Sequence, residues 1–358
     1  MTLHIPEEHF FPWSPDSPFL YDLTVGTTQG EEEQRDTVHS YFALRKWSCA
    51  PDVHDHALLP ERQAHPAQRP AGSGYWPEGL YTPPSDGAVV RELQTIKELG
   101  FNLLRKHAKI EPQRWYYHCD KLGLIVWQDM VNGGGPYKLW FVTYLTNVFQ
   151  PLLRRLPDAR PLWGLLGRET EAGREEYARE LEATVKALQC HPCVGCWVPF
   201  NEGWGQFDAA GAVEAVRRLD DTRLVDEASA GTIRAGEMWI PCTTISIRSG
   251  SGPGAVVALS EYGGIAWPMP GHEPPRSVWL RHGKEPGRAD RPLEKAAIGN
   301  GAPSAEKGLS ALVYTQVSDV EDEVNGLFTY DRAAIKPDPA AVRAVNQALE
   351  AAFEKATE

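Results

Sequence analysis

Two stretches near the amino terminus alternate apolar and polar side chains. Residues 19–25 and 37–45 both have this pattern, and the charged turn GEEEQRD lies between them. Strict alternation is typical of a strand with one packed face and one solvated face. Because two strands cannot bury a core alone, we expect this pair to be the edge of a larger sheet or an appendage packed on the rest of the chain.

From residue 100 onward, short apolar runs alternate with helical patterns. Strands are predicted at 101–107, 124–127, 196–200, 222–226, 245–247, 256–259 and 312–314, and helices at 85–99, 111–122, 137–156, 169–188, 207–219 and 339–353. Repetition of strand and helix predicts a parallel sheet with right-handed crossovers, which is either a doubly wound sheet or a closed (β/α)8 barrel. An eighth strand would have to come from residues 64–74, although residues 56–74 do not have the pattern of a strand.

Charged side chains at the ends of the apolar runs favour the barrel. They lie at or just after the carboxyl ends of the predicted strands: Arg105, His107, Asp129, Glu202, Glu227 and Glu261. In a barrel these ends converge on one mouth, where catalytic groups assemble. We therefore predict a (β/α)8 barrel.

Composition narrows the classes of ligand. The 358 residues carry 36 basic and 48 acidic side chains, a net charge of -12, which disfavours nucleic acid or an anionic membrane as the partner. No apolar run approaches the ~18 residues of a membrane span, and the first thirty residues lack a secretory signal, so the sequence as written predicts a cytoplasmic protein. Twelve tryptophans and twelve tyrosines supply flat apolar faces of the kind that sugar-binding clefts use.

Three cysteines lie just before and at the start of the strand predicted at 196–200. Cys190, Cys193 and Cys196 have C-x-x-C-x-x-C spacing, which raises the question of a metal or cluster site. The third cysteine falls inside the apolar run, and no fourth ligand lies at a matching spacing. We interpret the three as small buried thiols and expect neither a metal nor a cofactor.

Two glutamates end apolar runs directly. Asn201-Glu202 follows one run and is flanked by tryptophans, whose apolar surface would raise the pKa of a carboxyl and keep it protonated as a general acid requires. Glu261 follows the other, before a tyrosine and two glycines. Glycosidic-bond cleavage needs such a pair, one acid and one ionised carboxylate, ~5–5.5 Å apart in retaining enzymes.

At these residues the sequence resembles glycoside hydrolase family 2, which includes β-galactosidases, β-glucuronidases and β-mannosidases. The likeness covers residues 100–129, 191–207, 259–264 and 307–332, and residues 12–46 are similar to the last strands of the immunoglobulin-like sandwich that precedes the family's barrel. The resemblance implies three parts: the remnant of that β-sandwich at 1–48, an irregular linker with a weakly defined first barrel strand at 49–84, and the catalytic barrel at 85–358.

The resemblance also implies roles for single residues. Glu202 would be the acid/base and Glu261 the nucleophile of a retaining exo-β-glycosidase. Asn201 would bind the sugar 2-hydroxyl, and Arg105 would orient the nucleophile and keep it ionised. Asp129, Trp204, Tyr262 and Tyr314 would bind substrate beside them. His107 is one position out of register with the family's usual histidine.

The substrate class and the activity itself have alternatives. Family members that act on glucuronides carry an Asn-x-Lys motif, which this sequence lacks, so we expect a β-galactosidase-type enzyme. Residues 203–260 contain no tyrosine or histidine, and residues 49–74, 230–252 and 273–303 lose the family pattern, through divergence or compensating reading-frame errors. The alternative is therefore a non-catalytic barrel that binds carbohydrate. The oligomeric state is left open.

Overall fold

A computed structural model gives the structure of most of the chain. It describes residues 3–29, 34–49, 58–59, 67–72, 74–136, 138, 140–141, 158–201, 205–226, 244–248, 255–263, 266–272, 309–321 and 323–357. The irregular patches at 49–74, 230–252 and 273–303 lie largely outside these ranges. So does most of the helix predicted at 137–156.

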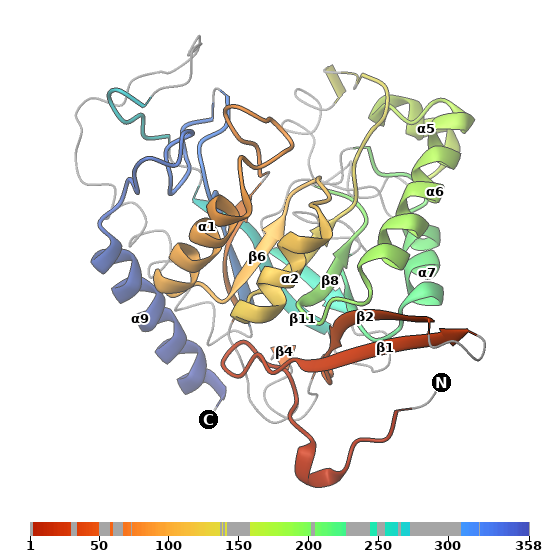
Figure 1. The fold of residues 1–358 in the computed structure, drawn as a ribbon. Coiled ribbons are helices and arrows are strands. Elements are labelled where there is room, and N and C mark those ends of the chain that lie inside the picture. Colours follow the sequence, from red (N-terminus) through yellow and green to blue (C-terminus); the bar gives the residue numbers. More distant parts are fainter. Residues whose placement is uncertain are drawn as a thin grey trace.

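Eight strands close into a barrel, which confirms the predicted fold class (Figure 1). They are β5 (Ala67–Gly72), β6 (Leu103–Lys106), β7 (Ile125–Asp129), β8 (Val194–Val198), β9 (Leu224–Val225), β10 (Thr244–Arg248), β11 (Ala255–Gly263) and β12 (Leu309–Thr315). All neighbouring pairs are parallel except those of β10, which runs antiparallel to both β9 and β11. The strand predicted at 245–247 is therefore present, but it departs from the all-parallel sheet that the pattern indicated.

The first barrel strand corrects the interpretation of residues 56–74. Despite its polar sequence, AQRPAG, β5 pairs with β12 over five residues. Pro70 is tolerated because β6 pairs only with Ala71 and Gly72, so Pro70 has a neighbouring strand on one side only. Pairing with strands distant in sequence, rather than local propensity, makes this segment a strand.

Five of the predicted helices are present in the described part of the chain, and the helices pack around the strands (Figure 1). They are α1 (Asp86–Glu98), α2 (Gln113–Leu122), α5 (Arg160–Trp163), α6 (Glu171–Leu188), α7 (Ala209–Leu219) and α9 (Pro339–Thr357), with 3-10 turns η1 (Glu7–His9) and η3 (Gly164–Leu166). The Ser85 side chain caps α1 by accepting from the Ala88 N–H at 3.2 Å. Gly123, with φ of +72°, ends α2 in the left-handed conformation. None of the helices in the described part of the chain combines the length and apolar surface needed to cross a lipid bilayer.

The predicted amino-terminal hairpin packs on the barrel. Strands β1 (Tyr21–Gln29) and β2 (Gln34–Phe42) pair antiparallel, and β3 (Ser48–Cys49) pairs with β4 (Leu58–Leu59). Two contacts of this region lie where α2 turns into β7: Trp13 donates its indole N–H to the Asp120 carbonyl at 2.7 Å, and the backbone of Pro15 covers Gly123. This is the end of the barrel opposite the carboxyl ends of the strands. The assignment of the hairpin to an immunoglobulin-like sandwich stays a prediction.

A buried acid joins the hairpin to the barrel. The Asp120 carboxylate accepts from the Tyr41 hydroxyl of β2 at 2.7 Å and pairs with His191 Nδ1 at 2.7 Å, while its other oxygen accepts from the Cys193 N–H at 2.8 Å. Burial alone would lower the pKa of His191, but the Asp120 carboxylate outweighs burial and raises that pKa to about 9. Protonated His191 therefore stabilises the junction.

This junction should make stability fall at alkaline pH. Because the folded-state pKa of His191 is raised from 6.5 to about 9, its contribution is complete below pH 6.5 and is lost as pH rises through about 9. We expect the difference in unfolding free energy between wild type and His191→Gln to shrink over that window, by at most about 3 kcal/mol, in urea titrations. His39→Gln, at an exposed position of the hairpin, is the control for the loss of a histidine away from this junction. A wild-type-to-His191→Gln difference that is constant with pH would contradict this.

Candidate active site

Arg105 is the centre of the predicted site. It lies on β6 with its side chain fully buried, and it contacts the ends of three other strands. Its Nε and Nη2 donate to the two oxygens of Asp129 on β7, at 3.0 and 2.9 Å. Its Nη1 donates to Glu261 Oε1 on β11 at 2.8 Å, and Nη2 also donates to Asn201 Oδ1, just after β8. The structure therefore brings four of the predicted site residues into one cluster.

The electrostatics of the buried pair favour the charged states of Arg105 and Asp129. Burial alone would lower the pKa of Arg105, but the carboxylates of Asp129, Glu261 and Asp226 outweigh it and raise that pKa. Burial alone would raise the pKa of Asp129, yet the Arg105 guanidinium and a hydrogen bond from His107 hold it below its ordinary value. A bidentate guanidinium–carboxylate pair is the geometry that best compensates two buried charges.

His107 joins this cluster in spite of its shift from the family register. Its Nδ1 lies 3.4 Å from Asp129 Oδ2, and its side chain is 37% exposed, so it lies between the buried pair and the solvent. Burial alone would lower its pKa, but the hydrogen bond and charge of Asp129 raise it above the ordinary value. The next residue, Ala108, takes a φ of +47° and donates its N–H to the same carboxylate oxygen at 3.3 Å.

Glu261 and two tyrosines line the neighbouring strand ends. Glu261 is 23% exposed, so it is accessible from the mouth while its Oε1 is held by Arg105. Tyr262 on β11 and Tyr314 on β12 meet edge to face with ring centroids 5.6 Å apart. Burial raises the pKa of Tyr314 to about 12, so both hydroxyls stay protonated near neutral pH. Gly263 is required here because a Cβ at that position would lie 2.5 Å from the Tyr314 ring.

Three predicted residues lie outside the described part of the chain. They are Glu202, Trp204 and Glu227, so the separation of the two glutamates is not described. Asn201, which immediately precedes Glu202, is described and touches Arg105.

Asp226 is a charged residue that the sequence interpretation did not single out. It follows β9 and is 1% exposed, and the charge of its carboxylate helps to raise the pKa of Arg105. Like the predicted residues, it ends an apolar run, so the rule that identified Asp129 could have found it. The pattern of charged strand ends indicates its neighbour Glu227 instead.

The cysteines behave largely as the sequence predicted. Cys193 and Cys196 are buried, Cys119 is buried near them, and Cys190 is exposed at the end of α6. The Cys193 thiol contacts the Tyr116 carbonyl at 3.6 Å. Two of the three thiols in the C-x-x-C-x-x-C run are therefore parts of the core, and the prediction of a buried thiol is wrong for Cys190.

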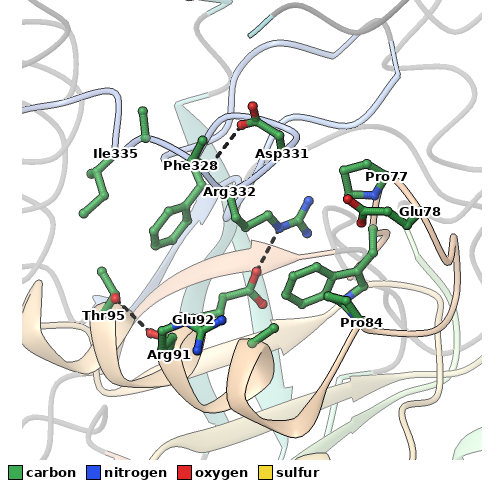
Figure 2. Close-up of a pocket in the computed structure, with 14 residues that line it drawn as sticks. Pro77, Glu78, Pro84, Arg91, Glu92, Thr95, Phe328, Asp331, Arg332 and Ile335 are labelled. Carbon is green, nitrogen blue, oxygen red and sulfur yellow. Dashed lines mark hydrogen bonds and ion pairs between the residues drawn. The ribbon is translucent and has the colours of Figure 1, made fainter.

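A separate pocket of about 380 Å³ lies between α1 and residues 328–335 (Figure 2). Arg332 lies across it, with its Nε bonded to Glu92 of α1 at 3.0 Å and its guanidinium 4.6 Å from the centre of the Trp76 ring. None of the predicted site residues lines this pocket. Its contacts tie the segment after β12 to the helix after β5, where the barrel closes.

Comparison with known protein families finds a match within the barrel. Residues 85–241 match the family described as glycosyl hydrolases family 2, TIM barrel domain, which confirms the predicted resemblance. A search of curated proteins finds no significant match.

Several solved structures share the fold. A β-glucuronidase from Parabacteroides merdae is 14% identical, with a TM-score of 0.58 over 96% of this chain and 43% of its own length. A family 2 β-galacturonidase from Eisenbergiella tayi is 14% identical, with a TM-score of 0.61 over 97% and 61%. A β-D-glucuronidase from Dictyoglomus thermophilum is also 14% identical, with a TM-score of 0.62 over 95% and 59%. The chain thus spans between 43% and 61% of the length of these structures.

Replacing only one residue of the buried Arg105–Asp129 pair should lower the unfolding free energy more than replacing both. Arg105→Met leaves the Asp129 carboxylate buried without its main counter-charge, which should cost about 3–5 kcal/mol of unfolding free energy. Adding Asp129→Leu removes the stranded charge and should recover part of that loss. Urea unfolding of the two single variants and the double variant measures the coupling. Strictly additive losses would show that the pair is not coupled.

Proposed function

We propose that this chain, which carries a glycoside hydrolase family 2 barrel, is a retaining exo-β-glycosidase. In the first step Glu261 attacks the anomeric carbon of a terminal sugar while Glu202 gives a proton to the departing oxygen. In the second step Glu202 takes a proton from water, the water oxygen bonds to the anomeric carbon, and the bond to Glu261 breaks. The chemistry needs no cofactor.

The observation that carries the proposal is the contact between Arg105 and Glu261. A buried guanidinium 2.8 Å from Oε1 orients a carboxylate that is partly open to the barrel mouth. The same guanidinium touches the residue before Glu202, so one side chain links the strand ends that bear both glutamates. A nucleophile must be held in place and accessible at once, and Glu261 satisfies both requirements.

The remaining residues have roles in sugar binding under this proposal. Asn201 would bond the 2-hydroxyl, where an interaction gains strength in the transition state. Tyr262 and Tyr314 would offer protonated hydroxyls and ring edges to the sugar. His107, partly exposed and paired with Asp129, would donate to a hydroxyl at the mouth.

A neutral sugar of the galactoside type is the proposed substrate. Two lysines lie near the site, Lys106 and Lys109, but both pair with Glu111, the latter at 3.0 Å. Both ammonium groups are buried and already bound to the one carboxylate of Glu111, which disfavours a sugar carboxylate as their partner. The similar solved structures include β-glucuronidases and a β-galacturonidase, so aryl β-galactoside should be compared with aryl β-glucuronide and β-galacturonide. Faster release from either uronide would overturn the galactoside assignment.

Replacement of the nucleophile tests the activity itself. Glu261→Gln keeps the shape of the side chain but removes the attacking charge, so turnover of an aryl β-glycoside should fall by ~10³-fold or more. Glu321→Gln, an exposed glutamate after β12, is the matched control and should keep full activity. Circular dichroism and thermal melting check that both variants fold.

Two outcomes would distinguish a glycosidase from a barrel that only binds carbohydrate. Full activity of Glu261→Gln would sink the assignment of the nucleophile. Saturable sugar binding by the wild type without release of the aryl group would favour a non-catalytic carbohydrate-binding barrel.

A further inference from the structure

The described residues just before Glu202, Pro199 and Phe200, are held by a tyrosine of α6. The Tyr177 hydroxyl donates to the carbonyl of Pro199, and its ring stacks on Phe200 with centroids 5.2 Å apart and planes 10° from parallel. All three residues are buried. The chain is therefore held in place two residues before Glu202.

Gly205, the first described residue after Glu202, is held by Arg168. This arginine precedes α6 and is 3% exposed. Its Nε donates to the Gly205 carbonyl at 2.6 Å, and its Nη2 donates to Asn132 Oδ1 in the loop after β7. Its guanidinium lies 5.2 Å from the Tyr177 ring centre and 5.3 Å from that of Phe207. The chain is thus held again three residues after Glu202.

Arg168 is itself immobilised by its surroundings. Arg174, in the first turns of α6, donates to the carbonyls of Arg168 and Glu169 at 2.7 and 2.9 Å. The Arg168 N–H donates to the Trp163 carbonyl at 2.9 Å. Asp158 then accepts from the Trp163 indole at 2.6 Å and from the Ala209 N–H at 2.9 Å, at the start of α7. These contacts join Asp158, Trp163, Arg168 and Arg174 to Gly205 and the start of α7, on the side of the barrel that bears α5, α6 and α7 (Figure 1).

We propose that Arg168 and Tyr177 are positioning residues that hold the Glu202 carboxyl where it can protonate the leaving group. The inference rests on the proposed function and adds two residues that neither the family resemblance nor the strand-end pattern indicated. Only four residues, 201–204, separate Phe200 from Gly205, and anchoring both ends restricts the conformations of so short a segment. A displacement of about 1 Å at a reacting group can cost ~10²-fold in rate.

A misplaced general acid leaves a characteristic kinetic signature. An alkoxide or phenoxide is a poor leaving group, so its departure depends on proton donation. A dinitrophenolate leaves readily without a proton. Loss of positioning should therefore slow poor leaving groups selectively, whereas general loss of folded enzyme slows all substrates equally.

The decisive comparison uses Tyr177→Phe and Arg168→Lys in the full chain. Tyr177→Phe keeps the ring stack on Phe200 and removes only the bond to Pro199. For a phenyl β-glycoside we expect kcat/KM to fall ~10-fold for Tyr177→Phe and ~10²-fold for Arg168→Lys. For the 2,4-dinitrophenyl glycoside of the same sugar, both variants should stay within about twofold of wild type. The alkaline limb of the pH–rate profile, which reports the proton donor, should also move.

Tyr116→Phe is the matched control for a purely structural effect. Tyr116 is also fully buried and donates its hydroxyl to Gln128 Oε1 at 2.5 Å, away from the Glu202 segment. It should affect both substrates equally. Equal slowing of both substrates by Arg168→Lys and Tyr177→Phe would overturn the positioning role while leaving the proposed function intact. Absence of turnover of both glycosides by wild type would instead overturn the proposed function, and this inference with it.

Discussion

The buried ion pair of Arg105 and Asp129 is the constraint on which the site depends. A guanidinium without exposure is stable only when its charge and its N–H groups are matched, and Asp129 does this with two hydrogen bonds from the neighbouring strand. The remaining donors then have defined directions, toward Glu261 and Asn201. One side chain therefore holds the ends of β6, β7, β8 and β11. The same contacts fix the position of Glu261, the proposed nucleophile.

The two ends of the barrel have different roles: contacts at one end stabilise the fold, and residues at the other end form the proposed active site. At one end, the buried Asp120 joins Tyr41 of the hairpin to His191 before β8, a network without a role in the proposed reaction. At the other end, Glu261 and His107 keep partial exposure. This division is the usual one for barrels of this class, in which the carboxyl ends of the strands bear the site. The Arg168 support extends the rigid part up to the segment of Glu202.

Local signals explain what could be predicted from the sequence. Apolar runs indicated β6, β7 and β8, Ser85 and Gly123 marked helix ends, and charged residues at strand ends indicated that Arg105, Asp129 and Glu261 converge. The failures involve contacts between distant residues. β5 exists because it pairs with β12, some 240 residues away, and Arg168 reaches Gly205 from a turn with no periodic pattern.

Covalent trapping of the nucleophile is the most direct measurement. A 2-deoxy-2-fluoro β-glycoside with a dinitrophenyl leaving group should transfer its sugar to the enzyme, because the fluorine slows both steps and the leaving group restores only the first. We expect one sugar per chain, with peptide mass spectrometry locating it on Glu261. Label on a different carboxylate, or no label while the enzyme hydrolyses ordinary aryl glycosides, would contradict the assignment of Glu261 as the residue that Arg105 holds for attack.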